Sequence, residues 1–183
     1  MGIHGAGIVG SSIARVLSMY ENLKVHVIEK EPDVGWGATK ANTSIIHPGH
    51  EEDPGKHPLR ARLCVRGNKI WRRWIKELEI PAKFPGELML AFNDEDLEQA
   101  RRYIDLARRN NVPGVRLITD RGELKQLEPN VSEDAIGALW APTAGQINPI
   151  QATRALIENA VDNGVMLHVE TKVIGIRVEK GLV

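Results

Sequence analysis

Apolar residues recur at helical spacing in some stretches and form short runs in others, which predicts a chain of alternating helices and strands. The short apolar runs predict strands at 24–29, 87–92, 115–118, 135–140, 165–169 and 173–178. The helical spacing predicts helices at 8–22, 58–78, 94–110, 120–127 and 149–163. Residues 30–58 show neither pattern, and so long a loop inside a compact domain is usually functional.

The predicted helices carry apolar stripes that we expect to face a core. The first stripe consists of Ile8, Val9, Ile13, Val16, Leu17 and Tyr20, with the helix expected to end at Asn22. The stripe of helix 58–78 consists of Leu59, Leu63, Ile70, Trp71, Trp74, Ile75 and Leu78. It lies opposite a basic face, which we interpret as solvated. The stripe of the last helix consists of Ile150, Thr153, Leu156, Ile157, Ala160 and Val161.

Two helix starts carry capping signals. Asp120 and Glu123 have the spacing of a capping box. Asn148 is a favourable cap residue, and Pro149 suits the first helical position because its missing N–H would have no partner there. Both signals predict where a helix begins, independently of its apolar stripe.

A glycine motif, Gly5-Ala-Gly7-Ile-Val-Gly10, lies just before the first predicted helix. Gly5 would permit a tight strand-to-helix turn, Gly7 would let a pyrophosphate approach the backbone, and Gly10 would let the helix pack closely on the sheet. Glu29 follows Gly10 by 19 positions and would accept hydrogen bonds from a ribose diol. The motif, the helix and the acidic residue together predict a dinucleotide site.

Composition narrows the function classes. Lys+Arg and Asp+Glu number 24 each, so no overall charge draws the chain to nucleic acid. Cys64 is the only cysteine and fits a reducing cytoplasm. No apolar run reaches the roughly 18 residues of a membrane span, and the N-terminus lacks the pattern of a signal peptide. We therefore expect a cytoplasmic protein whose membrane contact, if any, is peripheral to the inner face or made through a partner.

The long loop after Glu29 favours a flavin over a nicotinamide cofactor. A simple NAD-dependent dehydrogenase would continue directly with another helix and strand, whereas here the next strand after a crossover-length helix comes only near Val165. The interruption suits a cofactor with more to enclose than an adenosine half.

The sequence resembles the D-amino-acid-oxidase superfamily of FAD-dependent oxidoreductases. The resemblance rests on the glycine motif, Glu29-Lys30, the stretch 37–47 (GATKANTSIIH), 87–91 (ELMLA) and 145–149 (GQINP). Within that group, residues 42–67 are most similar to anaerobic-type glycerol-3-phosphate dehydrogenase and L-2-hydroxyglutarate dehydrogenase.

The resemblance implies an α/β, Rossmann-like, three-layer FAD-binding fold with the start of a substrate-domain β-sheet. Residues 1–80 would form the first part of the FAD-binding domain, 81–142 an inserted segment of the substrate domain, and 143–183 the return to the FAD-binding domain. Relatives continue well past 183 residues, so we expect a truncated chain that is part of a longer or multi-chain enzyme and is inactive alone.

The resemblance also implies site residues. Those expected to bind FAD are Gly5, Gly7, Ile8, Val9, Gly10, Glu29, Lys30, Gly37, Ala38, Thr39, Asn42, Thr43, Ser44 and Val173. His47 would lie near the flavin ring and is the expected catalytic residue. The chemistry would be hydride removal from a C–H that bears a hydroxyl. The acids in His50-Glu-Glu-Asp53 would repel an anionic substrate unless they point away.

Several alternatives remain open at this stage. The substrate could be glycerol 3-phosphate, L-2-hydroxyglutarate or an amino acid, and the chain could instead be a non-catalytic dinucleotide-binding fragment or a subunit that needs a partner chain. His47, His50, Glu51 and Asp53 could suggest a metal cluster, but Pro48 and Gly49 prevent helical presentation of the ligands. We expect no metal.

Overall fold

The computed structural model describes residues 1–177, which form two compact units. Unit 1 contains residues 1–44, 78–81 and 148–177, and unit 2 contains residues 45–77 and 82–147. These units differ from the segments expected from the sequence, chiefly because the long helix at 58–77 belongs to unit 2. The assignment of segments to a flavin domain and a substrate domain stays a prediction.

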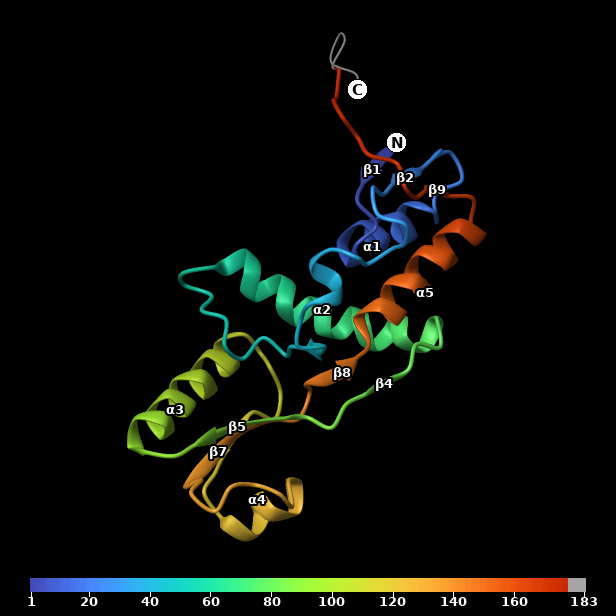
Figure 1. Ribbon diagram of the computed structural model, residues 1–183. Coiled ribbons are helices and arrows are strands. Elements are labelled where there is room, and N and C mark those ends of the chain that lie inside the picture. The colour runs from blue at the N-terminus through green and yellow to red at the C-terminus, as the bar shows by residue number, and fades with distance from the viewer. Residues whose placement is uncertain (178–183) are drawn as a thin grey trace. The chain divides into compact units, whose positions relative to one another are not determined.

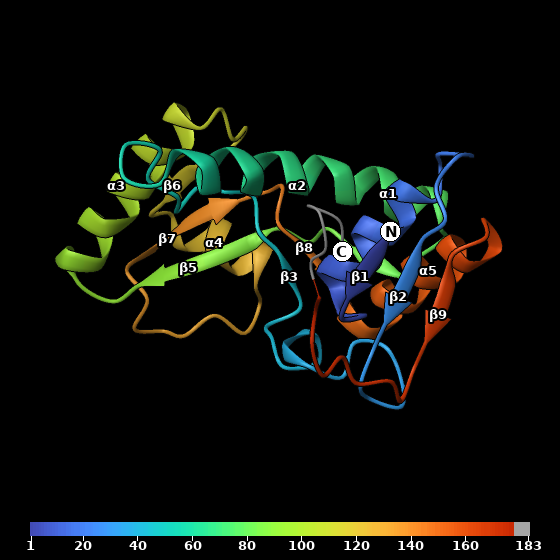
Figure 2. The same cartoon turned by 90° about the horizontal axis from the view of Figure 1, so that it is seen from above.

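Unit 1 is built on a parallel sheet. Its elements are β1 (Gly2–His4), α1 (Ile8–Leu17), β2 (His26–Ile28), η1 (Ala38–Lys40), α5 (Pro149–Asp162) and β9 (Met166–His168). The strand order is β1-β2-β9, with Ile3 opposite Val27 and Val27 opposite Leu167. Figures 1 and 2 show these strands beside α1 and α5. A Rossmann-like α/β arrangement, as predicted, is present.

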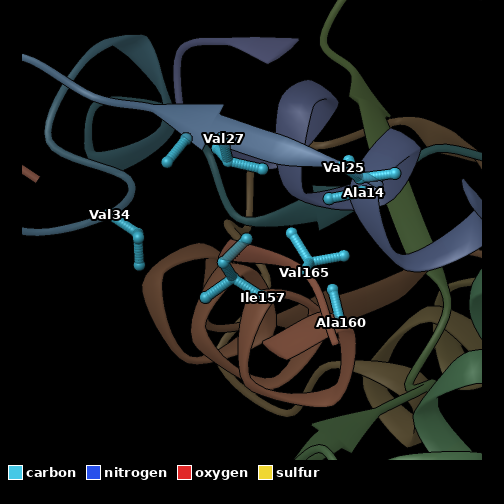
Figure 3. Close-up of a cluster of buried hydrophobic side chains, with 8 residues drawn as sticks. Ala14, Val25, Val27, Val34, Ile157, Ala160 and Val165 are labelled. Atoms are coloured by element: carbon cyan, nitrogen blue, oxygen red, sulfur yellow. The ribbon is translucent and has the colours of Figure 1, made fainter. Parts of the chain in front are cut away.

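The core of unit 1 lies between β2 and the two helices, which pack against each other. Val25 and Val27 point to the same face because side chains alternate along a strand. They meet Ala14 of α1 and Ile157 and Ala160 of α5, as Figure 3 shows. Since both helices contribute to one cluster, both cover the same face of the sheet.

The burial predicted for α1 was wrong in part: Leu17 packs against the core and Ile8 is half-buried, but the rest of the predicted stripe is exposed. Val9, Ile13 and Val16 are 70%, 46% and 40% exposed, and the buried residues are Ser11, Ala14 and Arg15. The helix packs through its small side chains, because a Cβ on Gly10 would lie only 1.9 Å from the Gly5 carbonyl oxygen. The helix also ends at Leu17, before the predicted end at Asn22, and leaves Tyr20 exposed.

The start of α5 was predicted correctly, and its buried face was predicted in part. The Asn148 side chain accepts hydrogen bonds from the N–H groups of Ile150 and Gln151, and Pro149 is the first helical residue. Thr153, Leu156, Ile157 and Ala160 are buried as expected, together with Ala152, whereas Val161 is 42% exposed and Ile150 only half-buried. The cap fixes the start of the helix, while its neighbours decide the width of the buried stripe.

The strand predicted at 173–178 is not present in its described part. Residues 173–177, including Val173, are irregular, and Val178 lies outside the described residues. A strand needs a partner for its backbone groups, and no described strand pairs with this segment.

Unit 2 is antiparallel. Its elements are β3 (Ile45–Ile46), α2 (Pro58–Glu77), β4 (Ala82–Lys83), β5 (Glu87–Ala91), α3 (Asp94–Arg109), β6 (Arg116–Ile118), α4 (Arg121–Leu127), β7 (Gly137–Ala141) and β8 (Gly145–Ile147). One sheet has the order β3-β8-β4 and the other β5-β7-β6. The short strands β3, β4 and β8 were not predicted, because two or three residues are too few to show a period.

The sheet β5-β7-β6 is covered on both faces. Leu139 of β7 belongs to a cluster with Ala100 and Ile104 of α3, whereas Ala138 belongs to another with Leu124 of α4. Successive residues of one strand therefore face different helices, as the strand period requires.

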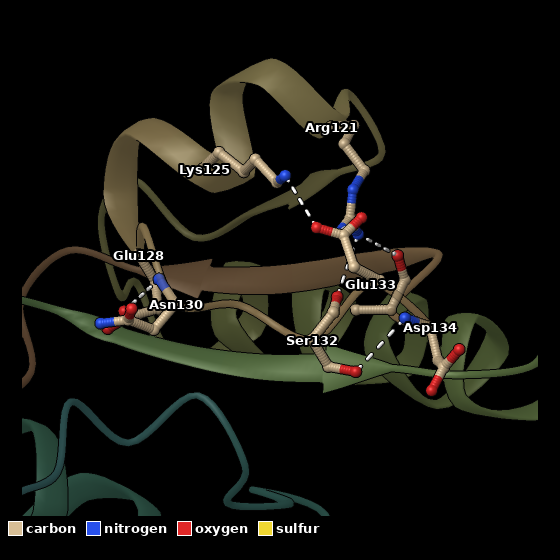
Figure 4. A network of polar contacts seen from close by, with 8 residues as sticks. Arg121, Lys125, Glu128, Asn130, Ser132, Glu133 and Asp134 are labelled. Atoms are coloured by element: carbon tan, nitrogen blue, oxygen red, sulfur yellow. Dashed lines mark hydrogen bonds and ion pairs between the residues drawn. The ribbon is translucent and has the colours of Figure 1, made fainter.

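Polar contacts fix the segment between α4 and β7, as Figure 4 shows. The Glu133 carboxylate lies 2.7 Å from the Arg121 guanidinium and 2.8 Å from Lys125 Nζ. Arg121 also donates to the carbonyl oxygens of Ser132 and Ala135. The predicted capping box of α4 is confirmed on one side, since the Asp120 carboxylate accepts from the Glu123 N–H at 2.7 Å.

The helix α2 matches its predicted range within one residue, but part of its predicted stripe is wrong. Trp74 is buried and Trp71 half-buried, as expected of core residues. Leu59 and Leu63, in contrast, are 58% and 52% exposed, because the first turns bury Ala61 instead. No helix among residues 1–177 is long and apolar enough to span a membrane.

Candidate nucleotide-binding site

The glycine turn of unit 1 joins β1 to α1 through a conformation that L side chains rarely adopt. Gly5 has a φ of +97°, and its N–H donates to the Ile28 carbonyl oxygen at 2.9 Å. Gly7 is the N-cap of α1 and has no side chain to satisfy the first N–H groups. Apart from the Ile8 N–H, which donates to the Thr39 hydroxyl, the start of α1 is an open helix N-terminus, which favours an anion.

The Glu29 carboxylate is fixed directly beneath this turn. Its Oε2 accepts a hydrogen bond from the Ala6 N–H at 2.7 Å, and its Oε1 accepts one from the Glu31 N–H at 3.0 Å. The residue follows β2 and is 8% exposed. A carboxylate has about four acceptor sites, so this geometry leaves Glu29 able to accept further hydrogen bonds from a ligand.

Glu29 carries its negative charge although it is largely buried. Burial alone would raise the pKa of its carboxyl, but the N–H groups of Glu31, Ala6 and Lys30 and the Lys30 charge outweigh that effect and lower the pKa. Backbone N–H groups act this way because they stabilise only the ionised form. The site therefore presents a fixed carboxylate at neutral pH.

The opposite wall comes from the segment around η1. The Thr39 hydroxyl oxygen accepts a hydrogen bond from the Ile8 N–H at 3.0 Å, and Thr39 is buried. The Asn42 side-chain amide donates to the Thr39 carbonyl oxygen at 2.6 Å, and its own oxygen accepts from the Ser44 N–H at 2.8 Å. Thr39 thus connects the loop to the N-terminus of α1.

These walls enclose a pocket of about 870 Å³. The predicted cofactor residues that line it are Gly5, Gly7, Ile8, Val9, Gly10, Glu29, Lys30, Gly37, Ala38, Thr39 and Asn42. Thr43, Ser44 and Val173 do not line it, and His47 belongs to unit 2. The structure brings most of the predicted residues together, although they come from segments far apart in the sequence.

The pocket has the features expected of a site for a dinucleotide with an unmodified ribose diol. A Cβ placed on Gly7 would lie 3.1 Å from Thr39 Oγ1, a tight contact that a larger side chain would worsen, so glycine keeps the space between the turn and the loop open. The open helix end suits a pyrophosphate, and the Glu29 carboxylate suits a diol and repels a 2′-phosphate. An FAD molecule has both of these groups in its ADP part.

A group of titratable side chains lies in unit 2 around the predicted catalytic residue. His47 is exposed, whereas His50 is 1% exposed and its ring meets the Tyr103 ring edge to face. Burial raises the pKa of the Glu87 carboxyl; nearby His47 opposes the rise and Glu51 reinforces it. Among the described residues, no group of three or more His, Cys, Asp and Glu side chains is placed to hold a metal ion.

Asn68 fixes the backbone at His47. The sequence analysis did not identify it as a site residue. Its side-chain amide lies within 3.0–3.4 Å of the carbonyl oxygens of Ile46, His47 and Thr143. Asn68 is buried in the middle of α2. Its position near the apolar stripe of the helix could have indicated a buried amide. Such an amide is expected to hydrogen-bond to neighbouring segments, because buried amides are normally hydrogen-bonded.

Comparison with known proteins gives a consistent picture. The family model described as "FAD dependent oxidoreductase" matches residues 2–183. Glycerol 3-phosphate dehydrogenase of Caloramator mitchellensis is 42% identical over 95% of this chain and 35% of its own length. Mitochondrial L-2-hydroxyglutarate dehydrogenase of Homo sapiens is 29% identical over 97% of this chain and 38% of its own length.

A solved structure supports the same fold. The chain superposes on dithionite-reduced L-alpha-glycerophosphate oxidase of Mycoplasma pneumoniae with FAD bound, with a TM-score of 0.88 and 27% identity. The match covers 98% of this chain and 46% of that one. The chain therefore spans less than half the length of each of these relatives.

Proposed function

The chain belongs to the FAD-dependent oxidoreductase family, and on that basis we propose that it holds FAD for the oxidation of a small hydroxy compound such as glycerol 3-phosphate. The proposal covers the activity of a protein of which this chain provides the nucleotide end and one group of titratable residues. The relative from Caloramator and the solved structure from Mycoplasma pneumoniae, both named for glycerol phosphate, support this substrate class.

The observation that carries the proposal is the Glu29 carboxylate, held by the Ala6 and Glu31 N–H groups on the wall of the pocket. Its remaining acceptor sites would bind the ribose diol of FAD. The N-terminus of α1, from Gly7 to Gly10, would stabilise the pyrophosphate charge. Thr39 and Asn42 would close the site from the loop side.

At the reacting end we propose His47 as the group that accepts the proton of the substrate hydroxyl. When bound, the flavin would supply the hydride acceptor. Asn68 would keep His47 in place through the His47 carbonyl oxygen. Glu87, with its raised pKa, would limit the negative charge near an anionic substrate. Proton transfer at a placed imidazole is a common contribution to such reactions.

Two alternatives remain. L-2-hydroxyglutarate, or an amino acid oxidised at its amine-bearing carbon, would use the same cofactor and a similar proton acceptor. A non-catalytic role, as a dinucleotide-binding subunit that needs a partner chain, would use the nucleotide pocket alone.

We also propose that the protein works in the cytoplasm, with any membrane contact peripheral.

The cofactor is tested by titrating the protein that carries this chain with FAD and with NADPH, each followed by its fluorescence. We expect FAD to bind at least tenfold more tightly, because Glu29 would repel the 2′-phosphate. Tighter binding of NADPH would overturn the proposal. Gly7→Val should abolish FAD binding without unfolding the protein. Gly67→Val is the matched control, since a Cβ at Gly67 would meet nothing within 4 Å.

The substrate is tested by mixing the FAD-loaded protein with glycerol 3-phosphate or L-2-hydroxyglutarate without oxygen and measuring bleaching of the flavin absorption. We expect glycerol 3-phosphate to bleach the flavin faster. Faster bleaching by L-2-hydroxyglutarate would support the alternative substrate, and no bleaching by any hydroxy or amino acid would support the non-catalytic role.

A further inference from the structure

A second cavity lies within unit 2, along the first half of α2. It has a volume of about 370 Å³, and its apolar surface comes from Pro54, Pro58, Ala61 and Val65. Ala61 is 2% exposed, so it forms part of the floor. The far wall is the end of α3, where the Asn110 side chain donates to the carbonyl oxygens of Gly49 and Glu52 and so fixes the loop before Pro54.

Basic side chains surround this apolar floor. Arg62, Arg66 and Lys69 of α2 line the cavity together with Arg109 of α3. Arg62, Arg66 and Lys69 occupy positions i, i+4 and i+7, which lie on one face of a helix. Because the chain has equal numbers of acidic and basic residues, this concentration of positive charge is local to the groove.

The three cations of α2 differ from most other arginines of the molecule. Arg60 lies 2.6 Å from Glu52, Arg73 lies 3.2 Å from Glu77, and Arg109 lies 3.6 Å from Asp53. Arg62, Arg66 and Lys69 have no carboxylate within ion-pair distance in the part of the chain that the structure describes. Three cations beside one another without a counter-charge repel each other, and an anionic partner would relieve that repulsion.

We propose that this groove binds an acidic peptide segment of a partner protein, in extended conformation. Arg62 and Lys69 are separated by about 10 Å along the helix, since each residue rises about 1.5 Å. In an extended peptide, side chains on one face repeat every 6–7 Å or so, so three acidic residues at alternate positions cover this distance. The apolar residues that alternate with the acidic ones point to the other face of the peptide, and through that face they would cover Ala61, Pro58 and Val65.

The shape and composition of the groove disfavour other anionic partners. A concave floor at Ala61 and Val65 is out of reach for the flat surface of an anionic membrane. The lining contains no aromatic side chain on which a nucleic-acid base could stack. The Arg109–Asp53 pair at the end of the groove adds a carboxylate that would repel a continuous polyanion.

The experiment measures binding of a fluorescein-labelled ten-residue peptide, in which Glu alternates with Leu or Ala, to the whole protein by fluorescence anisotropy. The wild-type protein should bind this peptide, and should bind the Gln version at least tenfold more weakly. Affinity should fall as salt rises. The double variant R62E/R66E should lose at least tenfold in affinity. The matched double variant K76E/K83E, which makes the same charge change at exposed positions of unit 2, should change it less than twofold.

Thermal unfolding of both double variants checks that they fold. Equal losses in the two double variants would mean that overall charge attracts the peptide, and the proposal would fall. It would also fall if the wild-type protein bound vesicles of anionic phospholipid, or an oligonucleotide, in a way that R62E/R66E abolished while the acidic peptide failed to bind. Absence of any peptide binding to wild type would have the same consequence.

Discussion

Gly10 lies where the first turn of α1 passes the end of β1. A Cβ there would be 1.9 Å from the Gly5 carbonyl oxygen, a distance that real Cβ atoms do not show, so the backbone would have to move. We expect Gly10→Ala to destabilise the fold by about 2–4 kcal/mol, in the range of severe core overpacking. Urea unfolding followed by circular dichroism measures the change.

Gly37 provides the control for that measurement. It lines the same pocket, but a Cβ at Gly37 would meet nothing within 4 Å. Gly37→Ala should therefore shift the free energy of unfolding by less than about 0.5 kcal/mol, as surface substitutions usually do. Equal losses of unfolding free energy in both variants would show that the close approach of Gly10 to Gly5 is not the cause of the destabilisation.

His50 is a buried imidazole whose ring nitrogens make no hydrogen bond to other described residues. Burial lowers its pKa; the Glu51 carboxylate, 3.6 Å from Nε2, opposes this effect and His47 reinforces it. A folded pKa below the unfolded value of about 6.5 means that the unfolded chain takes up the proton first. His50 thus contributes stability above about pH 6.5, and that contribution declines as the pH falls toward the folded pKa.

The expected slope from one such group is at most about 1.4 kcal/mol per pH unit. His50→Phe keeps an aromatic ring against Tyr103 and removes the titrating group, so it should flatten the loss of stability below pH 6.5. Denaturant unfolding between pH 5 and pH 8 or so measures the slope. His57→Phe, at an exposed position, should leave the slope as in wild type; an unchanged slope in His50→Phe would contradict the prediction.

At the scale of the elements, α2 holds two segments of unit 2 together through Asn68. The Asn68 amide donates to the carbonyl oxygens of Ile46 and His47 in one segment and of Thr143 in the other, and Arg72 also donates to the Thr143 carbonyl oxygen, at 2.9 Å. Asn68→Leu would leave buried carbonyl groups without a donor, at about 1–3 kcal/mol. We expect a loss of stability of that size by urea unfolding, together with slower substrate oxidation because His47 is displaced.

The rate supplies the second readout for Asn68. A purely structural role predicts that Asn68→Asp and Asn68→Leu lose stability and keep the rate per folded molecule. Lys76→Ala, on the exposed face of the last turn of α2, should change neither quantity. Full activity in a folded Asn68→Leu protein would show that this residue does not position His47.

The elements also show what a sequence pattern can and cannot predict. The starts of α4 and α5 were predicted because capping is local, with Asp120 and Asn148 accepting hydrogen bonds from residues two or three positions on. The buried face of α1 was predicted only at Leu17, because that face depends on how closely Gly10 lets the helix approach the turn at Gly5. Val9 and Ile13, the apolar residues of the predicted stripe, face outward instead.

In the candidate site, too, local features could be predicted from the sequence and tertiary contacts could not. The spacing of the glycine motif and Glu29 predicts a nucleotide site, and in the structure these residues line one pocket. The hydrogen bond between the Thr39 hydroxyl and the Ile8 N–H joins residues 31 positions apart, and no local sequence pattern predicts it. Asn68 and the paired or unpaired state of the arginines on α2 are equally non-local. Chemistry that rests on tertiary pairing becomes visible only in the structure.

At the scale of the whole molecule, unit 1 presents apolar surface beside its pocket. Val9 and Ile13 line the pocket and are 70% and 46% exposed, and Val16 on the same helix is 40% exposed. Among the described strands β1 pairs only with β2, so its other edge has no described partner. Exposed apolar residues next to an unpaired strand edge favour association.

We therefore expect residues 1–183, expressed alone, to self-associate and to show no measurable oxidation of glycerol 3-phosphate or L-2-hydroxyglutarate, because they span less than half the length of the relatives. Size-exclusion chromatography with light scattering measures the association, and dye reduction measures turnover. Ile13→Ser should lower the associated fraction, since it removes part of the apolar surface beside the pocket, whereas Ile174→Ser, at an exposed position that does not line the pocket, should lower it less. FAD should still bind, though weakly, because the Glu29 carboxylate and the glycine turn lie wholly within unit 1. A monodisperse protein that reduces the dye with either substrate would contradict the expectation, and would mean that these residues suffice to hold the substrate against the flavin.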